Sequence, residues 1–197
     1  MSYMKPSEIA KPHMIIMVGI PGSGKSFFAE NFAQTFKAPI ISFSKIYQEL
    51  FTKPTNGEHE YEIVLRAAQL MFNQIIKTKK TIIYDGPSSK RSDRNCLDKI
   101  AKEAGYQPIF IWVQTELLAA KKRALKPTNG QLAMTSDQFE IRMKQFSPPH
   151  PNEPTVVISG KHTYNTQLKI VLKSMIIPPP NTSPAVRSNK INNFLIR

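Results

Sequence analysis

The chain has 197 residues, 41% of them hydrophobic, and its 27 Lys and Arg against 14 Asp and Glu give a formal charge of +13. This length and apolar content suit one domain with its own core, whereas a single cysteine excludes an internal disulfide and no segment approaches the roughly 18 apolar residues of a membrane span. We therefore expect a cytoplasmic protein without membrane contact, whose charge favours nucleic acids or nucleotides as partners without selecting among them.

The first half of the chain alternates between apolar runs and helical patterns. Residues 14–18 form a continuous apolar run, which is typical of a strand buried on both faces of a parallel sheet. Helical spacing over residues 26–36 follows, and residues 40–42 predict a second short strand, which completes a β-α-β unit. Apolar residues at helical spacing then predict a long amphipathic helix over 58–78, with another strand at 81–84.

The second half continues the same alternation. Thr115 is expected to cap one helix, and Thr135 with Gln138 forms a capping box at the start of another. The loop and helix over residues 126–150 predict a small lid. The expected elements are, in order, a helix at 89–104, a strand at 108–113, helices at 116–125 and 135–146, a strand at 156–159 and a helix at 164–175.

The segment between the first strand and the first helix matches the phosphate-binding pattern G-x-x-x-x-G-K-[ST]. Its glycines let backbone N–H groups close around a phosphate, and the positive end of the following helix adds to the field there. Lys25 is expected to bridge the β- and γ-phosphates of ATP, and Ser26 to give its hydroxyl to Mg²⁺. The residues expected to contact ATP are Gly19, Ile20, Pro21, Gly22, Ser23, Gly24, Lys25, Ser26 and Phe27.

Asp85 directly follows the apolar strand at residues 81–84. It is therefore expected at the carboxyl edge of the sheet, where ligands bind in open α/β folds. There it can hold Mg²⁺ together with Ser26, so we expect Asp85 to serve both the metal and catalysis.

Basic residues follow at two further places. Arg91 and Arg94 lie on one face at the start of a helix, where guanidinium groups can clamp a substrate phosphate. The alternative is that they pair with surface carboxylates such as Asp93 or Asp98. Arg123 lies in a basic cluster where a helix meets the expected lid, so we expect it to reach the transferring phosphoryl group.

On these residues the chain resembles the small P-loop kinases related to polynucleotide 5′-hydroxyl kinase, a group that includes zeta toxins and gluconate kinase. The resemblance covers about residues 14–175 and includes the lid ending in Phe146-Ser147-Pro148-Pro149. It implies a three-layer α/β P-loop NTPase fold, with a central mostly parallel sheet, helices on both faces and a helical lid. It also implies ATP with Mg²⁺, a hydroxyl acceptor, Asp85 near metal and substrate, and Arg123 as a lid arginine.

This resemblance places the domain at residues 14–177. Residues 1–13 would then be an N-terminal extension. Three consecutive prolines begin a basic tail at 178–197, which either docks on a partner or forms a free terminus.

One departure from the family pattern affects the acceptor side. After the second strand the family usually has Ser-x-Asp-x-x-Arg, whose aspartate accepts the hydroxyl proton and whose arginine contacts substrate phosphate. Here Ser44 and Tyr47 occupy those two substrate-binding positions. Loss of a general base typically costs about 10²- to 10⁴-fold in rate. Either Asp85 or Glu49 replaces it, the acceptor is an ionised phosphate, or the protein binds ATP as a switch.

Two functional hypotheses follow. The first is a phosphotransferase that moves the γ-phosphate of ATP to a hydroxyl or phosphate acceptor, such as a polynucleotide end, a nucleoside or a nucleotide. The second is a nucleotide-dependent nucleic-acid-binding protein or ATPase switch with little transfer activity. The sequence leaves the acceptor and the oligomeric state open.

Overall fold

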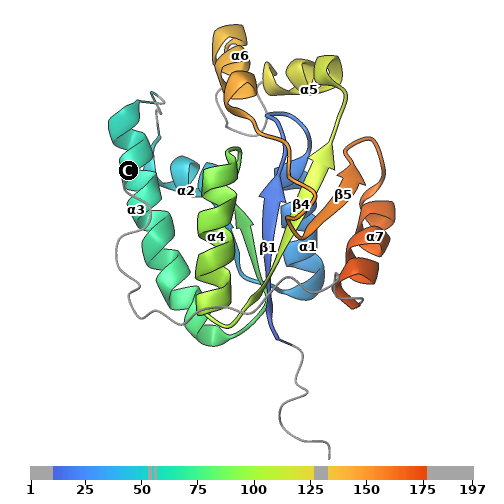
Figure 1. Cartoon of the computed structure of the whole chain (residues 1–197). Helices are drawn as coiled ribbons and strands as arrows, with labels where there is room; N and C mark the ends of the chain where they lie inside the picture. Colours follow the sequence, from blue (N-terminus) through green and yellow to red (C-terminus); the bar gives the residue numbers. More distant parts are fainter. Residues whose placement is uncertain (1–10, 53–54, 56, 127–132, 177–197) are drawn as a thin grey trace, which may run out of the picture.

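A computed structural model describes residues 11–52, 55, 57–126 and 133–176. Its centre is a five-stranded sheet in the order β2-β3-β1-β4-β5, in which all neighbouring strands are parallel (Figure 1). This confirms the predicted three-layer α/β P-loop fold. The strands are β1 (His13–Val18), β2 (Ile40–Ser42), β3 (Ile82–Asp85), β4 (Gln107–Gln114) and β5 (Thr155–Ser159).

The helices agree with the sequence pattern except at two places. Helix α2 was not expected, and the long helix predicted over 58–78 ends earlier, in a 3₁₀ turn at Ile76–Thr78. The helices are α1 (Lys25–Phe36), α2 (Phe43–Leu50), α3 (Glu58–Ile75), α4 (Arg91–Glu103), α5 (Leu117–Ala124), α6 (Ser136–Gln145) and α7 (Tyr164–Ile176).

The predicted caps have different outcomes. Thr135 accepts a hydrogen bond from the backbone N–H of Gln138, which confirms the capping box of α6. Thr115 does not cap α5, because Glu116 occupies the N-cap position. The Thr115 hydroxyl instead donates to the carbonyl oxygen of Ser23, at 2.8 Å.

The sheet separates two apolar cores, as expected when successive side chains of a strand point to opposite faces. In β1, Met14 and Ile16 belong to the core beneath α2, α3 and α4, whereas Ile15 and Met17 belong to the core beneath α1 and α7. All four side chains are fully buried. Helices therefore cover both faces and leave the carboxyl edge for the loops that follow the strands (Figure 1).

Strand register determines which residues meet at that edge. Ser42 of β2 pairs with Asp85 of β3, and Gln114 of β4 pairs with Ser159 of β5. The loop after β1 begins between these two pairs, because β1 is the central strand. Helices α5 and α6 lie beyond the same edge, at the top of Figure 1.

Several expectations concern parts of the chain that the structure describes only in part. The expected N-terminal extension lies mostly outside the described residues, and β1 begins at His13, one residue before the expected boundary. Residues 127–132 of the expected lid and the tail at 178–197 also lie outside. Within the described ranges, no helix is both long and apolar enough to cross a membrane.

Candidate functional site

The loop Gly19–Ser26 leads from β1 into α1, as the phosphate-binding pattern requires. Gly22 has a φ of 72°, a left-handed conformation that side chains rarely adopt. A Cβ atom on Gly22 would lie 2.1 Å from the carbonyl oxygen of Ala120. The backbone of α5 therefore packs directly on the loop. Phe27, the last residue expected to contact ATP, is 56% exposed.

Lys25 supplies the positive charge of this loop. Its Nζ donates to the carbonyl oxygens of Gly19 and Ile20, both at 2.9 Å. Loss of hydration lowers the pKa of Lys25 to about 8, while the negative charge of Asp85 raises it and the positive charge of Arg142 lowers it further. Two neutral carbonyls compensate an ammonium group poorly, so this charge is available for a phosphate.

Asp85 ends β3 and is buried. Burial raises the pKa of its carboxyl, and a hydrogen bond from the Ser26 hydroxyl and the charge of Lys25 act in the opposite direction. Ser26 and Asp85 thus present hard oxygens beside the loop, which fits Mg²⁺ with phosphate and water completing its shell. The described residues contain no group of three or more His, Cys, Asp or Glu that could hold a metal on its own.

The loop after Asp85 is fixed from two directions. The Ser88 hydroxyl, which is buried, donates to the carbonyl oxygen of Met17 in β1, at 2.6 Å. The carbonyl oxygen of Ser89 accepts the backbone N–H of Ser147, in the segment after α6. Asp85 is therefore held by a loop that is tied both to the strand preceding the phosphate-binding loop and to the base of the expected lid.

Arg94 holds this junction together and does not fit the expected substrate contact. Its side chain is fully buried, and its Nε lies 2.5 Å from the Glu153 carboxylate. Burial raises the pKa of Glu153, but hydrogen bonds from Arg94 and from the His150 backbone outweigh this, so the pKa is lowered. Its Nη2 also donates to the Glu153 carboxylate, at 3.1 Å, and the guanidinium further donates to the carbonyl oxygens of Ser88, Ser89, Ser147 and Pro148.

The other expected arginines have different surroundings. Arg91 is exposed at the start of α4. Arg123, at the end of α5, donates to the carbonyl oxygen of Gly160 at 3.3 Å. Arg142 was not expected from the sequence: it lies on α6, and its charge acts on both Lys25 and Tyr61. The charge of Arg142 therefore reaches Lys25 of the phosphate-binding loop, which the helical pattern alone could not show, and the expected contact of Arg123 with the phosphoryl group stays a prediction.

The acceptor-side positions form a separate group on α2. The Ser44 hydroxyl bonds to that of Ser42, at 3.1 Å. The Tyr47 hydroxyl donates to the carboxylate of Glu60, at the start of α3. Lys45, between them, forms an ion pair of 3.3 Å with Glu30 of α1. The structure thus brings Ser44 and Tyr47 onto one helix beside β3, and it adds a lysine that the sequence reading did not single out.

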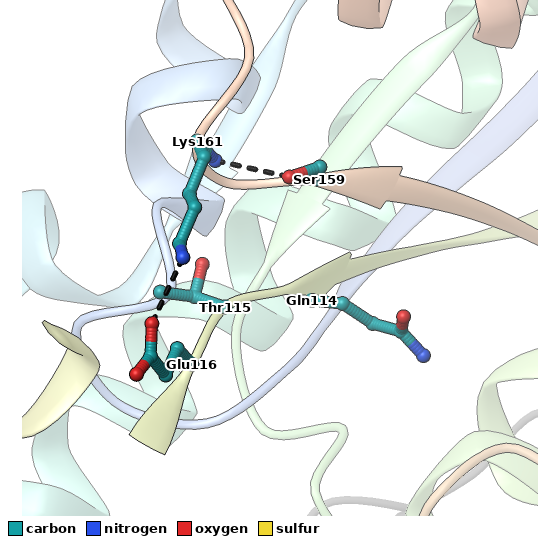
Figure 2. Close-up of a pocket in the computed structure, with 5 residues that line it drawn as sticks. All are labelled: Gln114, Thr115, Glu116, Ser159 and Lys161. Carbon is teal, nitrogen blue, oxygen red and sulfur yellow. Dashed lines mark hydrogen bonds and ion pairs between the residues drawn. The ribbon is translucent and has the colours of Figure 1, made fainter. Parts of the chain in front are cut away.

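An open pocket of about 420 Å³ lies at the ends of β4 and β5, on the side of the phosphate-binding loop away from α2. Figure 2 shows Lys161 directed toward Glu116 (2.8 Å), while its backbone N–H donates to Ser159. Gly160 is packed tightly here, since a Cβ atom would lie 2.1 Å from the Thr115 hydroxyl. The lining is polar and consists of Gln114, Thr115, Glu116, Ser159 and Lys161.

Comparison with protein families identifies the region that contains these residues. The family AAA_33, described as an AAA domain, matches residues 14–149. That range includes the phosphate-binding loop, Asp85 and Arg142. No curated protein matches the chain.

Solved structures share the fold at low sequence identity. A sugar kinase from Janibacter sp. HTCC2649 has a TM-score of 0.59 and 18% identity, covering 86% of this chain and 96% of that chain. Kti12 from Chaetomium thermophilum, in complex with ADP-AlF3, has a TM-score of 0.61, 17% identity and coverage of 81% and 96%. APS kinase CysC from Mycobacterium tuberculosis, in complex with AMPPNP and APS, has a TM-score of 0.59, 13% identity and coverage of 84% and 98%.

Proposed function

We propose, from the premise that the chain belongs to the AAA_33 family, that it is an ATP-dependent phosphotransferase that uses Mg²⁺. The observation that carries this proposal is the arrangement around Lys25. Among the described residues, its ammonium group donates to two carbonyl oxygens of its own loop only, and it lies beside the Ser26–Asp85 pair. The kinases among the similar folds support the same reaction class.

Different residues at the carboxyl edge bind different parts of ATP and its metal ion. The backbone of Gly19–Ser26 surrounds the phosphates, and Lys25 neutralises the charge on the β- and γ-phosphates. Ser26 and Asp85 hold Mg²⁺, which when bound neutralises charge on the transferring phosphoryl group. Arg142 adds a second positive charge from α6.

Arg123 takes a different role in this proposal from the one expected for it. Its guanidinium bonds to the Gly160 carbonyl, beside the pocket shown in Figure 2. It therefore borders the nucleoside part of ATP, which the open polar pocket at the ends of β4 and β5 accommodates. This assigns the transferring phosphoryl group to Arg142 and leaves Arg123 to position the nucleotide.

The experiment follows phosphate from γ-labelled ATP with Mg²⁺ into a panel of acceptors, which includes 5′-hydroxyl oligonucleotides, nucleosides, nucleotides and sugars. We expect label to enter at least one acceptor, and Lys25→Met to abolish this transfer. Lys77→Met is the matched control, because Lys77 lies in the 3₁₀ turn at the end of α3, away from the loop. Equal transfer by the wild type and Lys25→Met would refute the proposal.

The finer assignment to a polynucleotide 5′-hydroxyl kinase-like enzyme stays a prediction. The oligonucleotides in the panel test it directly. Binding of ATP without transfer to any acceptor would instead favour the nucleic-acid-binding or switch hypothesis. That hypothesis further predicts oligonucleotide binding that weakens steeply with salt.

A further inference from the structure

We infer, on the basis of the proposed function, that the acceptor presents an ionised phosphate oxygen to the γ-phosphate of ATP. Lys45 of α2 contacts this phosphate, and Arg142 of α6 adds positive charge where it meets the γ-phosphate. A neutral hydroxyl acceptor needs a base, and among the described carboxylates around the site Asp85, Glu30, Glu60 and Asp93 are already engaged.

Lys45 stands beside the reacting centre because of strand register. Ser42 pairs with Asp85, and α2 begins at the next residue, Phe43, so Lys45 lies in the first helical turn after that pair. Its ammonium group is 3.3 Å from Glu30, which faces it from α1, and its side chain is 51% exposed. A half-exposed lysine with one surface partner can turn toward an anionic ligand at small cost.

Arg142 approaches from the lid. Its helix, α6, lies above the carboxyl edge of the sheet (Figure 1), and the Arg142 side chain is exposed. Its positive charge lowers the pKa of both Lys25 in the loop and Tyr61 in α3. Lys45 and Arg142 therefore contribute positive charge from two different helices around Asp85 and Lys25.

The carboxylates that could take a proton from a hydroxyl acceptor have other partners. Asp85 accepts from the Ser26 hydroxyl and belongs to the proposed metal pair. Glu30 is paired with Lys45. The Glu60 carboxylate accepts both the Tyr47 hydroxyl and the backbone N–H of Thr55.

Of two further acidic residues, one has another role and the other lies farther from the site. Asp93 accepts the backbone N–H of Lys90 and the hydroxyl of Ser92, so it caps the start of α4. Glu49 lies four residues beyond Lys45 on α2, one turn farther from the Ser42–Asp85 pair. An acceptor that has already lost its proton removes the need for any of these groups to act as a base.

The chemical step then needs no proton transfer. An ionised oxygen of the acceptor phosphate forms a bond to the γ-phosphorus, while the bond from that phosphorus to the β,γ-bridging oxygen breaks. The electron pair of the broken bond leaves with ADP, and the product is a phosphoanhydride. Lys45 and Arg142 offset the repulsion between the two approaching anions, which is the main obstacle to this reaction.

The experiment compares acceptors that differ by one phosphate group. Each nucleoside is paired with its 5′-monophosphate, each sugar with its phosphate ester, and each 5′-hydroxyl oligonucleotide with its 5′-phosphate form. We expect label from γ-labelled ATP to enter only phosphorylated members, in an acid-labile anhydride. Label in an acid-stable monoester, on either member of a pair, would overturn the inference while leaving the phosphotransferase proposal intact. Absence of label from all members would overturn both.

The role of Lys45 is tested with the acceptor that takes label. Lys45→Gln should raise the KM for that acceptor about tenfold, as loss of one charge-assisted contact does, and leave the KM for ATP unchanged. Lys144→Gln, on the exposed surface of α6, is the matched control and should change neither constant. A Lys45→Gln enzyme with an unchanged acceptor KM would contradict the placement of the phosphate.

Discussion

Two cations of the described fold, one fully buried and one partly buried, differ in how fully their donors are used. Arg94 is fully buried and bonds to the Glu153 carboxylate and to carbonyl oxygens from two chain segments. Lys25 has only the carbonyl oxygens of Gly19 and Ile20. A cation that holds a fold together is surrounded by matched acceptors, whereas one that binds a ligand is left with acceptors that the ligand can replace.

The choice of residue matches this difference. A guanidinium stays protonated in proteins and offers donors in a fixed planar arrangement, so Arg94 can join fixed segments permanently. An ammonium group responds to its surroundings, and burial lowers the pKa of Lys25 to about 8. A bound phosphate would supply the negative charge that Lys25 lacks as a partner, and would thereby favour the protonated ammonium group. The following predictions test this comparison.

The largest effect is expected at the buried ion pair. Arg94→Met should lower the free energy of unfolding by about 3–5 kcal/mol, because it leaves the Glu153 charge buried without its partner. Urea denaturation of both proteins measures this difference. A loss below about 1 kcal/mol, the usual value of a surface ion pair, would contradict the structural role.

Arg91→Met provides the matched control for this prediction. Arg91 lies three residues earlier on the same helix but is exposed. Its replacement should change the free energy of unfolding by less than about 0.5 kcal/mol, as is usual for surface substitutions. The double variant Arg94→Met with Glu153→Gln should recover part of the loss, because no unpaired charge remains.

The second effect is on ligand binding. Lys25→Met should weaken ATP binding by about 1.5–3 kcal/mol, the value of a hydrogen bond to a charged group, which is roughly 10- to 100-fold. Unlike Arg94→Met, it should not lower the free energy of unfolding, because the wild-type charge is poorly compensated. Titration calorimetry and urea denaturation measure the two quantities. A destabilised Lys25→Met protein would make Lys25 a structural cation like Arg94.

The sequence predicted the fold well because the three central strands, β3, β1 and β4, are largely buried on both faces and form continuous apolar runs. It missed α2 because residues 41–47 were compared with a family motif, although Phe43, Ile46, Tyr47 and Leu50 have helical spacing. It also missed the partner of Arg94, since Glu153 is 59 residues away. Local patterns predict secondary structure and the phosphate-binding loop, but they do not predict which distant side chains meet.

The third prediction concerns pH and again separates the two cations. The pKa of Lys25 in the folded protein, about 8, is below its ordinary value of 10.5. Between these values the unfolded chain holds more protons, so raising the pH stabilises the folded state at this residue. The difference in unfolding free energy between the wild type and Lys25→Met should therefore increase as the pH rises across this range. ATP affinity should fall over the same range as Lys25 loses its charge, and parallel stability profiles would contradict the assignment.

The smallest effect is expected at His13, a third basic residue, which has a ring nitrogen without a hydrogen-bond partner among the described residues. Its backbone N–H donates to the Thr81 hydroxyl at 3.1 Å, but its Nε2 is buried without a partner among the described residues. Burial lowers the pKa of His13 below the ordinary value of 6.5. The unfolded chain therefore takes up the proton first as the pH falls, and the folded state loses stability below about pH 6.5. The unfolding temperatures of the wild type and His13→Gln, measured as a function of pH, should diverge there and should differ by a constant amount above about pH 7.5. A constant difference across the whole pH range would mean that Nε2 has a compensating partner. His13 would then resemble Arg94 rather than Lys25.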